Sequence, residues 1–323
     1  MTTLPHRALG ASGIDVSVVS LGSWMTFEHM PIDRGVAVMH AARDAGIDFL
    51  DDARYDDETG RAPIPSGYSE VVFGELFRAA GWRRDEVVVA NKLWWEFWPE
   101  QSAAGELDAS LGRMGLDHLD LAYAERPPAG LSVDEVVAQA GGLIAAGKLR
   151  AWGLLNWPAA LLAEAGRSAA AQGVAPPAAV QLPYSLVRRS PVEDADVAEA
   201  LAASGASVVA SAVLAGGALS GKYGATGATG ATDATGRLAG RGDDPALATA
   251  FAAGERLRAL AAGLDTTPAA LAIAYALRHP AVASALLGAT SPAQVAENVA
   301  ALDVAARLET DAEAAAQLLE VGR

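Results

Sequence analysis

Short apolar runs alternate with amphipathic stretches along the whole chain. The runs are rich in Val, Ile and Leu at both odd and even positions, which is typical of parallel strands buried on both faces. They predict eight strands, at residues 16–21, 47–51, 86–92, 119–123, 151–155, 179–182, 207–211 and 283–288. The amphipathic stretches predict helices at residues 34–45, 70–80, 101–114, 133–146 and 158–171.

The strands recur at a spacing of roughly 40 residues, with helices between them. This spacing favours a (β/α)8 TIM barrel of the α/β class. The alternative, a doubly wound sheet, is expected to carry G-x-G-x-x-G after its first strand, and this chain has no such motif there. Residues 7–18 predict an N-terminal β-hairpin that turns at Ser12 and Gly13. We therefore expect residues 1–323 to form a single barrel domain.

One segment interrupts the alternation. Residues 224–236 read GATGATGATDATG, a repeat of small residues that cannot bury enough surface to offset the entropy of ordering. We expect a mobile loop over residues 224–241, after the seventh strand. The alternative interpretation is a neutral, expanded linker.

Composition narrows the function classes. Hydrophobic residues make up 51% and charged residues 20% of the chain, which excludes a disordered protein. The absence of cysteine excludes disulfides, thiolate metal sites and a cysteine nucleophile. A net charge of −15 argues against nucleic-acid and membrane partners, because both present negative charge. Without a signal core or a long apolar stretch in the sequence, we expect a cytoplasmic protein.

The predicted strand ends carry the candidate chemistry, because the carboxyl ends of barrel strands meet at one mouth. Asp51 ends the second strand and Lys92 the third, with Tyr55 just beyond the second. A buried lysine that pairs with an aspartate favours a nearby phenolate, so it lowers the tyrosine pKa and prepares that tyrosine to protonate an oxyanion. The alternative is a structural Asp51–Lys92 ion pair beside an ordinary loop tyrosine.

Two other patterns near these strand ends are open to more than one interpretation. The segment KLWWEFWP at 92–99 favours an aromatic wall for a ring-shaped substrate, or else core packing or a lid hinge. Acidic residues at 51, 52 and 56–58 suggest a metal site, but such runs are more often solvated and no histidine joins this one. We expect no metal.

A set of short motifs, in a fixed order and spacing, carries a family resemblance. They are RALGASG at 7–13, LGSWMTF at 21–27, AGIDFLD at 45–51, SEVVFG at 69–74, WRR at 82–84, LDHLDL at 116–121, GKLRAWG at 147–153, SGKY at 220–223 and LGATSPAQ at 287–294. Over nearly its whole length the chain resembles the aldo-keto reductase superfamily, and most closely the branch that contains the potassium-channel β-subunits.

The resemblance implies that NADPH is the cofactor and that a small molecule is the substrate. By position, Trp24 would lie beside the nicotinamide, Asn156 and Gln181 would hold its carboxamide, and residues 214–222 would wrap the pyrophosphate. The residues implied to bind the cofactor are Ser23, Trp24, Asp51, Asn156, Gln181, Leu214, Gly217, Ser220, Lys222, Gly288, Thr290, Gln294, Glu297 and Asn298. For the last four the implied contact is the adenosine end, and Arg237 or Arg241 would take the ribose phosphate.

The helix start at Thr290, Ser291 and Pro292 is consistent with this assignment on independent grounds, because a helix N-terminus suits phosphate. Ordinary helix capping explains the same residues.

The chain departs from the family pattern at the catalytic residues. The resemblance implies Asp51, Tyr55 and Lys92 as catalytic residues, but Tyr55 follows Asp51 by four positions instead of the usual five, and Tyr68 is a weaker substitute. Glu125 stands where the family has histidine. A carboxylic acid kept neutral by burial would polarise the substrate oxygen and favour alkene or imine reduction. Alternatively, Glu125 is ionised and paired with Arg126 or Lys92.

The chain also departs from the pattern at the nicotinamide site. Leu155 replaces a serine, and Ser211 or Ala212 replaces a stacked aromatic residue. Losing a stacked ring costs on the order of 1 kcal/mol beyond the buried area.

We therefore predict an NADPH-dependent oxidoreductase that reduces a carbonyl or an activated double bond of a small substrate, with cyclic molecules among the candidates. Tyr55 is the expected proton donor. The first alternative is a catalytically impaired homologue that senses nucleotide or binds a partner. The second is a glycosidase that uses Asp51 and Glu125 as its two carboxylates. The sequence leaves the substrate and the oligomeric state open.

Overall fold

A computed structural model describes residues 4–57, 60–223, 238, 241 and 244–322. Nearly all of the expected mobile loop at 224–241 lies outside these residues, as does Arg237. Both expectations therefore stay predictions.

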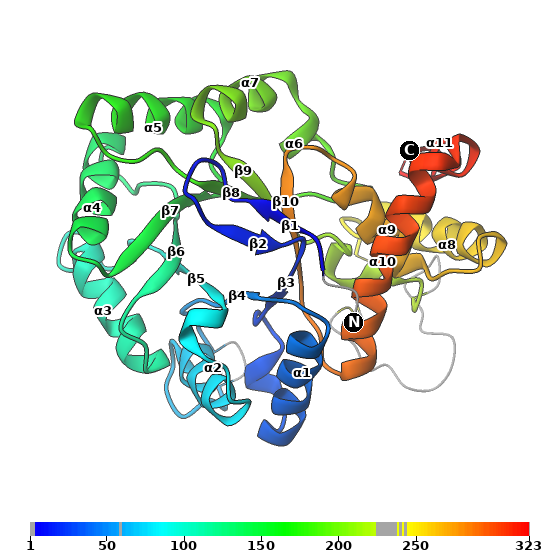
Figure 1. Cartoon of the computed structure of the whole chain (residues 1–323), viewed down its shortest axis with the longest axis horizontal. Coiled ribbons are helices and arrows are strands. Elements are labelled where there is room, and N and C mark those ends of the chain that lie inside the picture. Colours follow the sequence, from blue (N-terminus) through cyan, green and yellow to red (C-terminus); the bar gives the residue numbers. More distant parts are fainter. Residues whose placement is uncertain (1–3, 58–59, 224–237, 239–240, 242–243, 323) are drawn as a thin grey trace.

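Eight parallel strands close into a barrel, in the order β10-β3-β4-β5-β6-β7-β8-β9 (Figure 1). They are β3 (Val19–Gly22), β4 (Phe49–Asp51), β5 (Val88–Leu93), β6 (Leu119–Ala124), β7 (Leu149–Leu155), β8 (Ala179–Pro183), β9 (Ser207–Ser211) and β10 (Val282–Leu287). Almost every residue of these strands is buried, as expected for a sheet covered on both faces. The predicted (β/α)8 barrel is confirmed.

An antiparallel hairpin of β1 (His6–Ala8) and β2 (Asp15–Ser17) precedes the barrel, as predicted. The prediction of one strand over 16–21 was wrong, because the chain changes sheets at Val18. There the Val18 amide donates to the Pro5 carbonyl, and the Ser17 hydroxyl bonds to the Val19 carbonyl. These bonds end the hairpin strand one residue before β3 begins.

The hairpin lies across the amino-terminal end of the barrel. Apolar side chains from Leu9, Ile14 and Val16 pack with Phe49 and other residues of the barrel interior. Arg7 donates to the carbonyl of Val282 in β10 and to that of Leu277 at the end of the preceding helix, and these bonds hold the hairpin against the barrel. With this end filled, the open mouth is at the carboxyl ends of the strands.

Helices surround the barrel (Figure 1). They are α1 (Ile32–Asp44), α2 (Tyr68–Ala79), α3 (Ala103–Met114), α4 (Val133–Ala145), α5 (Ala159–Gln172), α6 (Ser190–Glu193), α7 (Ala195–Ser204), α8 (Ala248–Gly263), α9 (Pro268–Leu277), α10 (Pro292–Thr310) and α11 (Ala312–Val321). Three short 3-10 helices are η1 (Phe27–His29), η2 (Arg84–Glu86) and η3 (Ala215–Ser220). The five helices predicted from amphipathic pattern are all present, with ends displaced by at most two residues.

No single helix in the described part of the chain is long and apolar enough to cross a bilayer. Taken together, α8 and α9 pass the same test on length and composition, but they are bent by 98° relative to each other.

The interior glycines of α2 and α3 give a matched test of the packing between helices. A Cβ at Gly74 would lie 2.2 Å from the carbonyl oxygen of Met114, whereas a Cβ at Gly112 would meet nothing within 4 Å. We expect Gly74→Ala to lower the free energy of unfolding by about 1–3 kcal/mol, because the backbones must separate. Gly112→Ala should raise it by about 0.5–1 kcal/mol, because alanine has the better helix propensity. Urea unfolding of both variants checks this, and equal effects would contradict it.

Candidate active site

Asp51, Tyr55 and Lys92 come together at the carboxyl-terminal mouth of the barrel. The Lys92 ammonium donates to Asp51 Oδ1 at 2.6 Å, to the Asp52 carbonyl at 3.1 Å and to the Tyr55 hydroxyl at 3.3 Å. Asp51 and Lys92 are almost completely buried, and Tyr55 is half-buried. The structure therefore forms the expected triad, and Tyr55 reaches Lys92 despite its shorter spacing from Asp51.

The loop after β4 turns back onto the first turn of α2, and this fold directs Tyr55 toward the mouth. The Ser69 hydroxyl donates to the Ala53 carbonyl at 2.5 Å, and the Gly67 amide donates to the Tyr55 carbonyl at 2.8 Å. Gly67 has φ +79°, a conformation that glycine adopts without strain. These contacts compensate for the missing residue between Asp51 and Tyr55.

The expected low pKa of Tyr55 was wrong. Burial raises the pKa of Tyr55 above its ordinary value, and the Lys92 charge opposes this without reversing it, while Asp51 and Asp52 raise the pKa further. Burial lowers the pKa of Lys92, but the interactions of Lys92 with Asp51 and Tyr55 together outweigh burial and leave that pKa above its ordinary value. The site thus holds a charged lysine beside a phenol that keeps its proton.

Ser23, an expected cofactor contact, is buried and bonded to Asp52. Its hydroxyl donates to Asp52 Oδ1, while Asp52 Oδ2 has no hydrogen-bond partner among the described residues. Burial raises the pKa of the Asp52 carboxyl well above its ordinary value, and the nearby Glu70 raises it further. Sequence reasoning missed Asp52 as a buried acid, because only its place in the barrel removes it from water.

The two expected carboxamide ligands are neighbours at the ends of β7 and β8. The Asn156 amide donates to the Gln181 carbonyl at 3.0 Å, and Asn156 is exposed with φ +58°. The Gln181 side chain donates to Asp51 Oδ2 at 3.0 Å, so it is partly committed to the triad. Leu155, which precedes Asn156, is buried.

The segment expected to hold the pyrophosphate contains η3 and follows β9. Gly216 and Gly217 have φ of +70° and +104°, and the exposed Lys222 folds back so that its Nζ lies 3.5 Å from the position of a Cβ on Gly217. The Ser220 hydroxyl donates to the Gly217 carbonyl, and the Leu214 carbonyl accepts from the Gly217 amide. Ser220 and Leu214 therefore shape the turn from within.

The expected adenosine-binding residues lie between the end of β10 and the first turns of α10, and β10 pairs with β9, the strand that precedes this turn. Gly288 and Gln294 are exposed, Thr290 and Glu297 are half-buried, and Asn298 is buried. The Gln294 side chain accepts from the Thr290 amide at 2.7 Å. Among the arginines considered for the ribose phosphate, Arg241 is exposed and pairs with Asp244.

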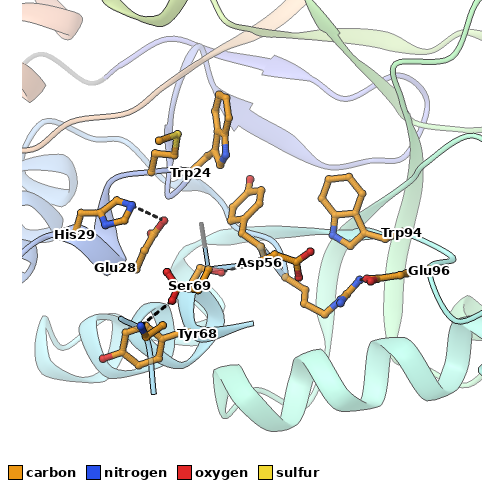
Figure 2. A pocket seen from close by; sticks show the side chains of 13 residues that line it. Trp24, Glu28, His29, Asp56, Tyr68, Ser69, Trp94 and Glu96 are labelled. Atoms are coloured by element: carbon orange, nitrogen blue, oxygen red, sulfur yellow. Dashed lines mark hydrogen bonds and ion pairs between the residues drawn. The ribbon is translucent and has the colours of Figure 1, made fainter. Parts of the chain in front are cut away.

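A cavity of about 510 Å³ opens beside Tyr55. Figure 2 shows Trp24 and Glu28 on one side of it and Trp94, Asp56 and Glu96 on the other. Its lining is completed by Met25, His29, Arg54, Tyr55, Asp57, Ala62, Tyr68 and Ser69. Of the aromatic residues at 94–98, only Trp94 lines this cavity, whereas Trp95 belongs to the core. Core packing therefore accounts for part of the expected aromatic wall.

Glu106 on α3 fixes Trp94 in the cavity wall. Its buried carboxylate accepts from the Trp94 amide at 2.7 Å and from the Trp95 amide at 3.2 Å. Trp95 has φ +60°, an uncommon conformation for a bulky residue. Sequence analysis did not single out Glu106, because its partners lie in another element.

Glu125, at the end of β6, lies beside its neighbour Arg126. Its carboxylate accepts from the Arg126 amide at 3.0 Å and lies 3.5 Å from the Arg126 guanidinium. It is not among the side chains that line the cavity. Of the two readings of Glu125, the pairing with Arg126 is therefore the one present in this structure.

No group of three or more His, Asp or Glu side chains in the described part of the chain is arranged to hold a metal ion. Glu58, which belongs to the acidic run considered above, lies outside that part.

The aldo/keto reductase family model matches residues 18–318, which is nearly the whole chain. The chain belongs to the aldo/keto reductase family. This family consists in general of oxidoreductases that use NADP(H).

Three similar proteins carry names that concern potassium channels. The chain is 31% identical to a probable voltage-gated potassium channel subunit beta of Oryza sativa subsp. japonica, over 93% of this chain and 92% of that protein. It is 29% identical to a protein of the same description from Arabidopsis thaliana, with the same coverage. It is 30% identical to a putative voltage-gated potassium channel subunit beta of Schizosaccharomyces pombe, over 93% of this chain and 88% of that protein.

The buried acid beside the triad gives a pH-dependent prediction. Because the pKa of Asp52 is raised in the folded chain, that chain keeps a proton over a pH range in which the unfolded chain has lost it. Asp52 therefore makes folding less favourable as pH rises through that range, starting near its unfolded pKa of about 4. We expect Asp52→Asn to gain stability relative to the wild type as pH rises from about 4 to neutrality. Urea unfolding across this range tests it, and a difference independent of pH would contradict it.

Proposed function

We propose that this protein reduces the carbonyl group of a small molecule bound in the 510 Å³ cavity, with NADPH as the reductant. The observation that supports this most is the Lys92 ammonium, which bridges the Asp51 carboxylate and the Tyr55 hydroxyl at the edge of that cavity. A (β/α)8 barrel of this family with a lysine-linked tyrosine has the groups that a carbonyl reduction needs.

The turn after β9 suits the cofactor's phosphates. Gly216 and Gly217 carry no side chains, so a phosphate can approach the backbone of the turn closely, and the Lys222 ammonium beside Gly217 supplies positive charge. The α10 helix follows β10, the strand that pairs with β9, and its first turn carries the positive end of the helix dipole. We propose that residues 214–222 and the start of α10 hold the phosphates and adenosine, and that Trp24, Asn156 and Gln181 hold the nicotinamide.

NADPH held by these residues would supply the hydride for the carbonyl carbon, and the negative charge would then develop on the carbonyl oxygen. Tyr55 gives its proton to that oxygen, since a phenol whose pKa is raised keeps its proton until a strong base forms beside it. The phenolate left behind faces the Lys92 ammonium, which stabilises it. Asp51 keeps Lys92 charged, and solvent returns a proton to Tyr55.

A two-carboxylate hydrolase fits the site less well. One oxygen of Asp51 accepts from Lys92 and the other from Gln181, while Glu125 is bonded to Arg126. Both oxygens of Asp51 are thus committed to hydrogen bonds, so Asp51 is not available as the second carboxylate that such a hydrolase needs.

Replacing the two tyrosines in turn identifies the proton donor. We expect Tyr55→Phe to lower kcat for an aldehyde by about 10²–10⁴-fold, because the general acid is lost. Tyr68→Phe is the matched control, since Tyr68 also lines the cavity but begins α2 and makes no bond to Lys92. Its kcat should stay near that of the wild type. Affinity for NADPH, measured by fluorescence quenching, should be unchanged in both variants. The reverse pattern would assign the role to Tyr68.

Glu125 remains proposed as a group that polarises the substrate oxygen once it has left Arg126. On that proposal Glu125→Ala lowers kcat by about 100-fold, and Glu125→Gln lowers it much less, because an amide also donates a hydrogen bond. Steady-state kinetics with an aldehyde and with an activated alkene measure both. Full activity of Glu125→Ala would exclude this role and leave the pair with Arg126 as structural.

The relatives' names favour a second candidate function, in which the barrel binds a partner and turns over little or no substrate. Binding of NADPH without any oxidation over a broad panel of aldehydes would support it. The cytoplasmic location, the single-domain organisation and the absence of nucleic-acid or membrane partners stay proposals drawn from composition.

A further inference from the structure

The cavity beside Tyr55 carries an excess of negative charge. Four carboxylates line it, those of Glu28, Asp56, Asp57 and Glu96. Against them stand one permanent cation, Arg54, and one histidine, His29. The four carboxylates come from three separate segments, after β3, β4 and β5. Their negative charge therefore surrounds the opening of the cavity and is not confined to one solvated surface.

The charge of Arg54 is used within the wall itself. One guanidinium nitrogen pairs with Glu96, another donates to the Ser66 hydroxyl at 2.9 Å, and the group lies 5.4 Å from the centre of the Phe97 ring. Only 9% of the Arg54 side chain is exposed. Arg54 therefore connects two loops and neutralises Glu96. It forms no ion pair with Glu28 or Asp56 among the contacts described.

Three carboxylates remain: Asp57, which accepts from the Ala62 amide, and the two that matter here, Glu28 and Asp56. Glu28 Oε1 lies 3.5 Å from His29, which is charged only when protonated, and Glu28 Oε2 is buried with no hydrogen-bond partner among the described residues. Asp56 is exposed, and its side chain forms no ion pair with any residue that the structure describes. A buried carboxylate oxygen without a partner is costly, and a cation that reached it would recover that cost.

Two indole rings border the same space. Trp24 is 49% exposed although it is a large apolar residue, and Trp94 lies on the opposite side of the cavity (Figure 2). Glu106 accepts a hydrogen bond from the Trp94 amide. Indole faces attract ammonium groups, and most strongly when carboxylates lie nearby and water is displaced. Aromatic faces and carboxylates together select for charge sign, because a neutral or anionic group gains nothing from the carboxylates.

We propose that the substrate is an aldehyde or ketone that carries a positively charged ammonium group, which binds between Glu28 and Asp56 against Trp24 and Trp94. The inference rests on the proposed function for its reacting carbonyl, and it goes further in naming the substrate class. A substrate with a carboxylate, such as a keto acid, would be repelled.

The first test compares three benzaldehydes that differ only at the para position. Trimethylammonio and tert-butyl groups have nearly the same shape and differ in charge, and a carboxylate has the opposite charge. The readout is the ratio of kcat/KM for the cationic aldehyde to that for the tert-butyl aldehyde, compared between proteins, so that the intrinsic reactivity of each aldehyde cancels. We expect this ratio to fall about tenfold in the double variant Glu28→Gln, Asp56→Asn.

Glu75→Gln is the matched control, because Glu75 is an exposed glutamate on α2 that does not line the cavity. Its ratio should equal that of the wild type. Added salt should lower the wild-type ratio, since screening weakens attraction to an open site. A ratio unchanged in the double variant, or a wild type that prefers the carboxylate aldehyde, would overturn the proposal.

A binding measurement separates this proposal from the proposed function. Quenching of tryptophan fluorescence is followed with the trimethylammonio benzyl alcohol and with its tert-butyl counterpart, neither of which requires turnover. Tighter binding of the cation by the wild type, lost in the double variant, would support the proposal even if no aldehyde were reduced. Equal binding of the two alcohols would overturn it even if all three aldehydes were reduced.

Discussion

The ion pair between Lys92 and Asp51 is the interaction on which the rest of the site depends. Burying either charge alone would cost on the order of several kcal/mol. The buried pair is tolerated because the Lys92 ammonium and the Asp51 carboxylate both have their hydrogen bonds satisfied. Lys92 bonds to Asp51, to the Asp52 carbonyl and to Tyr55, while the second Asp51 oxygen accepts from Gln181. Strands β4, β5 and β8 therefore contribute to one network across the barrel mouth. A change in any of these strands alters the surroundings of Tyr55.

The electrostatics of this network explain how a tyrosine with a raised pKa still suits acid chemistry. Burial makes the phenolate costly, so Tyr55 holds its proton at neutral pH, while the Lys92 charge reduces the cost of releasing it at the moment a negative oxygen forms. A proton donor needs to be protonated before the reaction and stabilised after it. One buried lysine, kept charged by Asp51, meets the second requirement without undoing the first.

Hydrogen bonds from the surrounding helices set the shape of the mouth. Ser69 on α2 anchors the loop that carries Tyr55, and Glu106 on α3 anchors the turn that carries Trp94. Both are buried, and of the two only Ser69 belongs to the cavity lining. The amino-terminal hairpin fills the opposite end, so binding and chemistry are confined to one face. The acidic and aromatic character of the cavity then follows from loop residues, which the barrel positions but does not itself determine.

The sequence by itself determined the architecture, because the period of its apolar residues and the spacing of its strands allow few alternatives. It also predicted which strand ends would carry Asp51 and Lys92. Only the tertiary structure decided the rest. It showed that Tyr55 reaches Lys92 although one residue is missing, because the loop turns back onto α2. It placed Glu125 against Arg126 and buried Ser23 against Asp52, whereas local sequence gives no information on either environment. It also reversed the expected pKa of Tyr55, because desolvation depends on burial by residues distant in sequence, and a spacing pattern contains no measure of burial.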